Sequence, residues 1–174
     1  MTPQAQDAID RFLETALRIF PSLDPETEAA VDRMAKLIKH LDRVTERTVG
    51  RFGLNTGEFK VLLKLVQVPD QRLSAGALSE MLSLSTGAMT NRLDRLEEAG
   101  FATRERDPND RRSVVVTMTP LGREVLDKAV AAQAEEERHL LSALTSDELH
   151  RLNALLRKVM LRIEKDQEPS SGPH

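Results

Sequence analysis

Hydrophobic residues recur at helical spacing along most of the chain, with polar residues between them. The first such segment covers residues 4–19 and ends before Pro21. The second begins at Asp24 and Pro25, a typical N-cap and first-turn pair, and is predicted to run to about Val49. Capping residues predict further helix starts at Asn55, Ser74, Ser85, Thr119 and Thr145. The pattern therefore predicts a mainly α-helical chain.

After Gly100 the pattern changes from a helical period to alternation. Residues 101–106 and 113–118 are predicted strands, and the second is rich in valine, which favours a pleated sheet. The residues between them begin Asp-Pro-Asn-Asp, which is typical of a turn. A short helix over 75–82, a helix over 85–99 and then a β-hairpin predict a winged helix-turn-helix fold, mainly α with a small β-hairpin wing.

The same pattern divides the chain into five parts. Residues 1–22 are predicted to form an extra N-terminal helix, 23–54 a dimerisation helix and 55–119 the winged helix-turn-helix lobe. Residues 120–166 are predicted to form C-terminal dimerisation helices, the first reaching about residue 143, and the Pro- and Ser-rich residues 167–174 a disordered tail. The apolar faces of the end helices are too extensive for one lobe to cover, so we expect a homodimer.

Composition and charge narrow the function. The chain has 174 residues, a formal net charge of -3 and no cysteine, which excludes disulfides, cysteine-ligated metals and thiol nucleophiles. It has no metal-ligand spacing, phosphate-binding glycine loop or nucleophile elbow, so we expect neither an enzyme nor a cofactor. Its longest apolar run is too short for a membrane span, so we expect no membrane partner and a soluble, cytoplasmic protein. Any binding to nucleic acid has to come from local charge placement.

The helix predicted over residues 85–99 carries the first set of candidate DNA contacts. Its apolar stripe consists of Met89, Leu93 and Leu96, so the polar side chains of the opposite face point to solvent. Such a helix fits the major groove of B-DNA, where Asn suits adenine and Arg suits guanine or phosphate. The candidate contacts are Ser85, Thr86, Thr90, Asn91 and Arg95.

The predicted hairpin carries the second set of candidate DNA contacts. A narrow minor groove attracts arginine, and a neighbouring carboxylate can hold the guanidinium in place. The candidate wing contacts are Arg106, Asp107, Asp110, Arg111 and Arg112. A turn with surface ion pairs would contain the same residues, so the interpretation as a wing depends on the helix-turn-helix that precedes it.

Several of these segments resemble one known family. Residues 100–104 (Gly-Phe-Ala-Thr-Arg), 107–112 (Asp-Pro-Asn-Asp-Arg-Arg) and 119–122 (Thr-Pro-Leu-Gly) resemble the wing of the MarR family of bacterial transcription regulators. The likeness covers about residues 28–164. It implies an obligate homodimer of winged-helix domains whose N- and C-terminal helices interdigitate. It also implies a ligand-responsive repressor that binds double-stranded DNA at a pseudo-palindromic operator.

Within that family the chain is similar to the PecS or urate-responsive branch, through its extra N-terminal helix and residues 53–59 and 85–97. In that branch a Trp on the first helix and an Asp just after Glu-Phe help to hold urate. This chain has no Trp, and Lys60 stands at the Asp position, whereas Arg92 remains. A cationic pocket suits a compact polycarboxylate, so we expect a small anionic ligand such as citrate or aconitate, held by Arg11, Lys60 and Arg92.

Two other functions are compatible with the sequence alone. A helical interaction protein without DNA binding would account for the long amphipathic helices, but not for the Arg-rich hairpin after a helix-turn-helix. A winged helix that binds double-stranded RNA would show the same pattern. A competition between matched DNA and RNA duplexes separates these cases.

Overall fold

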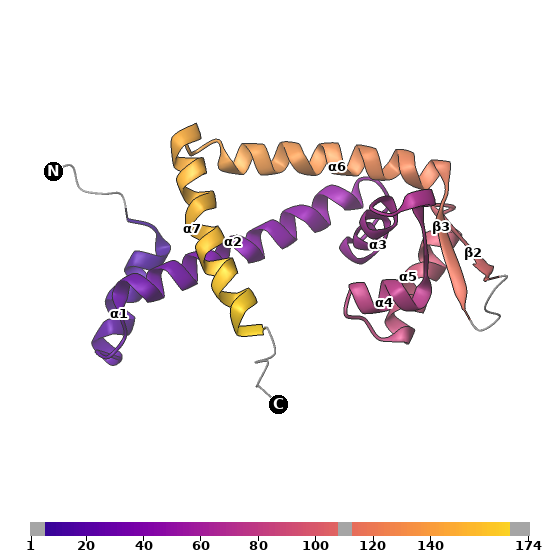
Figure 1. Cartoon of the computed structure of the whole chain (residues 1–174). Coiled ribbons are helices and arrows are strands. Elements are labelled where there is room, and N and C mark those ends of the chain that lie inside the picture. The colour runs from indigo at the N-terminus through magenta and orange to yellow at the C-terminus, as the bar shows by residue number, and fades with distance from the viewer. Residues whose placement is uncertain (1–5, 108–112, 168–174) are drawn as a thin grey trace, which may run out of the picture. The chain divides into compact units, whose positions relative to one another are not determined.

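The computed structural model describes residues 6–107 and 113–167, and it confirms a mainly helical winged-helix fold with a small antiparallel sheet (Figure 1). The chain falls into two compact units, Met1–Val130 and Ala131–His174. The helices are α1 (Ala8–Ile19), α2 (Pro25–Gly50), α3 (Thr56–Val66), α4 (Ala75–Met81), α5 (Thr86–Glu98), α6 (Pro120–Leu141) and α7 (Ser146–Gln167). The strands are β1 (Arg72–Ser74), β2 (Ala102–Arg106) and β3 (Val114–Met118), and a 3-10 turn, Pro69–Gln71, precedes β1.

The helices of the lobe begin where the sequence supplies a capping side chain. Asn55 Oδ1 accepts a hydrogen bond from the backbone N–H of Glu58 at 2.9 Å, and Glu58 Oε2 accepts one from the N–H of Asn55 at 2.9 Å. This reciprocal capping box starts α3. The hydroxyls of Ser74 and Ser85 accept from the N–H three residues on, at 3.0 and 3.3 Å, and start α4 and α5. The predicted starts of these three helices are confirmed.

The ends of three helices differ from the prediction. α1 begins at Ala8, later than the predicted start at Gln4, because Asp7 and Asp10 form a capping box there. α6 ends at Leu141 instead of residue 143. α7 continues through Gln167, which is helical, so the predicted disordered tail is wrong for that residue. The other tail residues, 168–174, lie outside the described residues.

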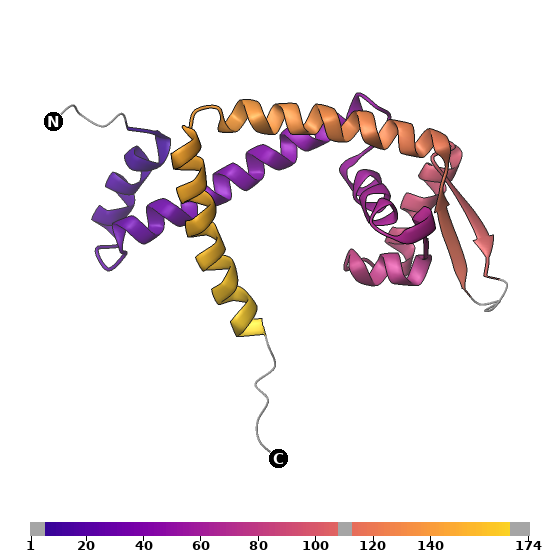
Figure 2. The ribbon, with the colours of Figure 1, turned by 45° about the horizontal axis from the view of Figure 1, so that its top comes forward.

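The winged-helix lobe is built around one hydrophobic core. Its sheet has the order β1-β3-β2 with both pairings antiparallel, and β2 and β3 run side by side at the edge of the lobe (Figure 2). β1 was not predicted, because three residues are too few to reveal an alternating pattern. The core includes fully buried side chains from three helices and β3, namely Val61, Leu62, Leu65, Leu78, Met89, Leu96 and Val116.

The start of α6 lies in close contact with Phe101, the residue before β2. Gly122 lies so near Phe101 that a Cβ on the glycine would be 2.0 Å from the Phe101 carbonyl oxygen. The backbone N–H of Thr119 donates to the same oxygen at 3.0 Å, and Thr119 Oγ1 donates to the carbonyl of Gly100 at 2.7 Å. Gly100 follows α5 with φ 72°, a left-handed conformation that glycine adopts without strain.

α1 is fastened to α2 by apolar packing and by one arginine. Arg33 of α2 binds both carboxylates at the start of α1, with Nε 3.0 Å from Asp7 Oδ2 and Nη2 2.6 Å from Asp10 Oδ1. The hydrogen bond from Arg33 lowers the pKa of Asp7 to about 2. A small separate core between the two helices contains Ile9, Leu13 and Ala29.

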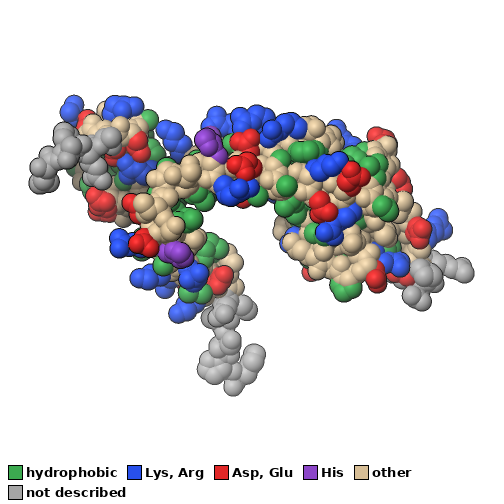
Figure 3. Space-filling model, turned by 90° about the horizontal axis from the view of Figure 1, so that it is seen from above, with side chains coloured by type: hydrophobic (Ala, Val, Ile, Leu, Met, Phe, Trp, Pro, Cys, Tyr) green, Lys and Arg blue, Asp and Glu red, His purple; other side chains and the backbone are tan. Residues whose placement is uncertain are grey.

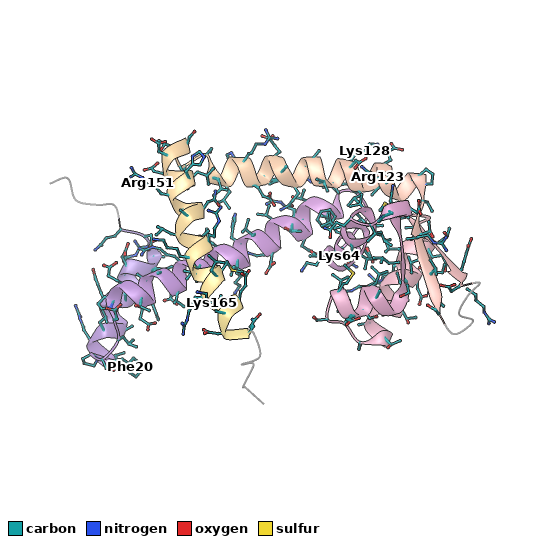
Figure 4. The ribbon with its side chains drawn as sticks, in the orientation of Figure 1. Phe20, Lys64, Arg123, Lys128, Arg151 and Lys165 are labelled. Atoms are coloured by element: carbon teal, nitrogen blue, oxygen red, sulfur yellow. The ribbon has the colours of Figure 1, made fainter. Side chains whose placement is uncertain are left out.

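The long helices leave large apolar side chains exposed. Phe20, labelled in Figure 4 just after α1, is 58% exposed. No residue of α7 is buried. The exposed apolar residues of α2 are Val31, Leu37 and Ile38, and those of α7 are Leu155, Leu156, Val159, Met160, Leu161 and Ile163. Each helix therefore offers an apolar face for which the described chain provides no complete cover.

Candidate nucleic-acid interface

The polar face of α5 is open to solvent. On its inner side Met89, Leu93 and Leu96 are at most 2% exposed. The five predicted contacts of this helix and its N-cap are all exposed, namely Ser85, Thr86, Thr90, Asn91 and Arg95. The apolar stripe thus orients the helix as predicted, and contact of these five residues with DNA stays a prediction.

The hydroxyl groups at the start of α5 are already partly engaged. Ser85 Oγ accepts from the N–H of Ala88 at 3.3 Å, and Thr90 Oγ1 donates to the carbonyl of Thr86 at 2.9 Å. Ser85 therefore keeps its hydroxyl proton for an external acceptor, whereas Thr90 keeps acceptor capacity only. Together with the N–H groups at the start of α5, the Ser85 hydroxyl suits a phosphate oxygen.

Arg95 reaches solvent and forms one long ion pair with a buried carboxylate of α3. Its side chain is 63% exposed, and its Nη1 lies 3.8 Å from Oε1 of Glu58, a carboxylate that is only 7% exposed. The same Oε1 accepts from Asn55 Nδ2 at 2.7 Å. The capping box at the start of α3 predicted Glu58 as a helix cap, but not its link to α5. At 3.8 Å this is a long ion pair and not a hydrogen bond, so it attracts the guanidinium of Arg95 without fixing its orientation.

A polar hollow of about 400 Å³ lies between α2, α3 and α5. Arg92 of α5 extends over Gly57 of α3, where an added Cβ would be 2.7 Å from Arg92 Nε. Glu46 of α2 accepts from the N–H of Thr56 at 3.2 Å and from the Thr56 hydroxyl, and these bonds lower the pKa of Glu46. The hollow thus contains a carboxylate that the sequence analysis did not single out.

The three predicted ligand residues do not meet in this hollow. Arg92 lines it together with Arg95, whereas Lys60 of α3 and Arg11 of α1 are exposed and lie outside its lining. A larger hollow of about 680 Å³ lies between α1 and α2, but its lining does not include Arg11 and contains the carboxylates of Asp10, Glu14 and Glu26. Among the described residues, the two cations that line the smaller hollow, Arg92 and Arg95, both belong to α5.

The structure describes the wing as far as Asp107 and again from Ser113. Arg106 is exposed and pairs in register with Val114, and the N–H of Asp107 donates to the carbonyl of Ser113 at 3.0 Å. The predicted hairpin is confirmed by this pairing. The other predicted wing contacts, Asp110, Arg111 and Arg112, lie outside the described residues.

One arginine that the sequence analysis did not single out ties the wing to α5. Arg104 Nη1 lies 2.6 Å from Asp94 Oδ1, and Arg104 Nε donates to Glu97 Oε2 at 3.0 Å. The hydrogen bonds from Arg104 lower the pKa of Glu97. A signal was present, because Asp94 and Glu97 share one face of the helix and Arg104 shares a strand face with the buried Ala102.

Basic and acidic side chains are interspersed on the face shown in Figure 3, in keeping with the net charge of -3. Throughout residues 6–107 and 113–167, no helix is long and apolar enough to cross a membrane, and no group of three His, Asp or Glu side chains could hold a metal ion.

Comparison with known proteins points to one family. Residues 54–114 match the MarR family. The chain is 30% identical to the HTH-type transcriptional regulator PecS of Dickeya dadantii, over 80% of this chain and 84% of PecS. It is 33% identical to the HTH-type transcriptional regulator YkoM of Bacillus subtilis, over 78% of this chain and 88% of YkoM. The crystal structure of a mutant MarR from E. coli complexed with operator DNA superimposes with a TM-score of 0.62 at 27% identity, covering 82% of this chain and 96% of that one.

Proposed function

This chain belongs to the MarR family of DNA-binding transcriptional regulators, and we propose that it is a ligand-released repressor. A homodimer binds a pseudo-palindromic operator, and a small anion releases it. The proteins of this family are regulators of transcription and not enzymes.

The observation that carries the proposal is the exposed polar face of α5 beside the hairpin. With the buried stripe turned inward, Asn91 and Arg95 are free to read base edges in the major groove, and the start of α5 to meet phosphates. Arg106, with Arg111 and Arg112 further along the chain, then enters the adjacent minor groove. The related MarR of E. coli, solved in complex with operator DNA, supports DNA as the partner.

The proposed dimer is formed by the helices before and after the lobe. The exposed apolar faces of α2 and of α7 support it, because exposed apolar patches often mark protein interfaces. A two-fold dimer places its two copies of α5 about one helical turn of DNA apart, roughly 10 base pairs. Light scattering at micromolar concentration tests the dimer, and a monomeric mass contradicts it.

The proposed ligand is a compact polycarboxylate such as citrate or aconitate. Arg92 and Arg95 in the hollow between α2, α3 and α5 support an anionic ligand. In this proposal Lys60 and Arg11 contribute from their exposed positions only if the dimer brings them to the bound anion. The ligand releases DNA because it binds more tightly to a conformation of the dimer in which the distance between the two winged-helix lobes does not fit the operator.

The test is binding of the protein to the intergenic DNA upstream of its own gene, followed by fluorescence anisotropy. Wild type should bind this DNA more tightly than a scrambled duplex, and millimolar citrate or aconitate should release it while urate does not. Chloride or sulfate at the same ionic strength is the control, because anions weaken any protein–DNA complex by screening. If citrate acts only as the salt control does, or acts equally on Arg92→Ala, the proposed ligand is wrong.

A matched RNA duplex tests the second candidate function. The proposal expects the RNA to compete poorly for the protein, because an α-helix does not fit the deep, narrow major groove of A-form RNA. Equal competition by RNA would favour an RNA-binding winged helix. Absence of binding to either duplex would favour a helical interaction protein.

A further inference from the structure

Arg104 of β2 makes the side-chain bridge from the wing to the recognition helix α5. Its guanidinium spans two carboxylates one turn apart, with Nη1 2.6 Å from Asp94 Oδ1 and Nε 3.0 Å from Glu97 Oε2. Nη2 also contacts Glu97. Since several guanidinium nitrogens are engaged on two different side chains, the bridge fixes the orientation of the arginine as well as its position.

The bridge lies where the hairpin leaves the hydrophobic core. In the β2–β3 register Arg104 is opposite Val116, which is fully buried, and the next pair outward on that face is Arg106 opposite Val114, which is 38% exposed. Two-stranded ribbons beyond a core twist readily and have little stability of their own. The angle between the outer hairpin and α5 therefore depends on what holds the strands at this exit point.

The ion pairs contribute little to the stability of the lobe as a whole. The side chains of Arg104, Asp94 and Glu97 are 26, 47 and 42% exposed, and ion pairs in such surroundings are screened by water. The contacts that hold the lobe together are those of its buried core. The main consequence of the bridge is therefore geometric.

We infer that Arg104 is a positioning residue for operator recognition, which holds the wing at a fixed angle to α5. This inference rests on the proposed contacts of α5 and the wing with DNA. Once α5 lies in the major groove, a wing at the right angle meets the minor groove without further ordering. A wing whose angle to α5 varies has to be fixed when DNA binds. The conformational entropy lost in this step lowers the affinity for the operator.

Two other roles of Arg104 make different predictions. In the first, Arg104 only neutralises Asp94 and Glu97, which would otherwise repel phosphates from α5. In the second, it contacts a phosphate itself. Under the first role, removing the two carboxylates compensates for losing the arginine. Under the second, Arg104→Ala lowers the operator affinity by the same factor whether or not the other wing contacts are present.

The test is a double-mutant cycle on operator binding at several salt concentrations. Arg104→Ala is measured in the wild-type chain and in a chain without the proposed wing contacts, which carries Arg106→Ala, Arg111→Ala and Arg112→Ala. We expect Arg104→Ala to weaken binding about tenfold in the wild-type chain and less than about twofold in the wing-deficient chain, where there is no wing contact left to position. The salt dependence of the wing-deficient chain should not change further, since Arg104 releases no counterions of its own.

Two further variants separate positioning from charge and from folding. Asp94→Asn with Glu97→Gln in the Arg104→Ala chain should not restore binding. Arg123→Ala is the matched control, because Arg123 pairs with Asp127 on α6 with Nε 3.0 Å from Oδ1 and is removed with the same change of charge (Figure 4). Arg104→Ala and this control should unfold at the same urea concentration, and only Arg104→Ala should lose operator affinity.

Each of the opposite results overturns the inference. An equal loss in the wild-type and wing-deficient chains assigns Arg104 to its own phosphate contact, and restored binding in the Asp94→Asn, Glu97→Gln chain assigns it to neutralisation. A loss that tracks a lower urea midpoint makes the role purely structural. Failure of wild type itself to bind the operator refutes the proposed function instead, so the two failures are distinguishable.

Discussion

Replacing Gly122 by alanine should loosen the joint between α6 and the wing. A Cβ at this position would be 2.0 Å from the carbonyl oxygen, 2.8 Å from the carbonyl carbon and 3.0 Å from the Cα of Phe101. All three are backbone atoms, so no side-chain rotation relieves the overlap. The start of α6 has to move away from β2 by more than an ångström, on the order of the difference from a normal carbon–oxygen contact.

The size of the effect follows from three contributions. Overpacking of this kind typically costs about 1–3 kcal/mol of unfolding free energy. The movement also strains the bonds from Thr119 to Phe101 and Gly100, now 3.0 and 2.7 Å, and each lost hydrogen bond costs about 1 kcal/mol. The higher helix propensity of alanine raises the unfolding free energy by up to about 1 kcal/mol and offsets part of this loss. We expect a net loss of about 2–3 kcal/mol.

Urea unfolding followed by circular dichroism measures this loss. A change of about 2–3 kcal/mol moves the midpoint by roughly 1 M for an ordinary denaturant dependence. Wild type and variant have to be compared at one protein concentration, because the stability of a dimer depends on it. Operator affinity should fall as well, since the moved joint carries β2 with it.

Gly87→Ala is the matched control. Gly87 lies within α5 and has no heavy atom within 4 Å of an added Cβ, so alanine should leave the midpoint unchanged or raise it. If Gly122→Ala unfolds at the same urea concentration as wild type, the close approach of α6 to Phe101 is wrong. If both variants lose stability equally, the effect belongs to glycine replacement in general.

Three further predictions concern the wing, the recognition helix and the joint between α1 and α2. Arg111→Ala with Arg112→Ala should weaken operator binding and lower the slope of affinity against salt by about 2, and an unchanged slope would remove both from the phosphate contacts. Asn91→Ala should lose about 1–3 kcal/mol at one base pair, measured on operators with single substitutions, and equal weakening on all of them would make it a phosphate contact. The pKa of Asp7 is lowered from 3.8 to about 2 in the folded chain, so its contribution is present above pH 3.8 and is lost as the pH falls toward 2. Proton titration by NMR should show Asp7 moving back toward its ordinary pKa in Arg33→Ala.

The parts of the fold that were predictable are those encoded by neighbouring residues. An N-cap and the apolar stripe behind it lie within a few residues, so the starts of α3, α4 and α5 and the buried face of α5 follow from the sequence. The change of period at Gly100 likewise predicted the hairpin. The capping box of Asp7 with Asp10 has the same local origin, but the prediction placed the helix start at Gln4, ahead of this cap.

The features that were not predictable join residues far apart in the chain. β1 becomes a strand only because Leu73 pairs with Val116, and nothing within Arg72–Ser74 announces that pairing. Glu46 of α2 accepts a hydrogen bond from Thr56 at the start of α3, and Glu58 of α3 forms an ion pair with Arg95 of α5. Periodicity places each of these side chains on a face, but only the tertiary fold decides which face meets which. The candidate ligand site was the least predictable, because its residues were drawn from different helices.

The charges of α5 show why such pairs matter for function. Taken alone, the helix carries Arg92 and Arg95 against Asp94, Glu97 and Glu98, a poor balance for binding a polyanion. In the fold, Asp94 and Glu97 are both bound by Arg104 of β2, so these two carboxylates hold the wing against the helix. We therefore expect the geometry of the DNA-binding surface to depend on one residue outside the recognition helix, Arg104.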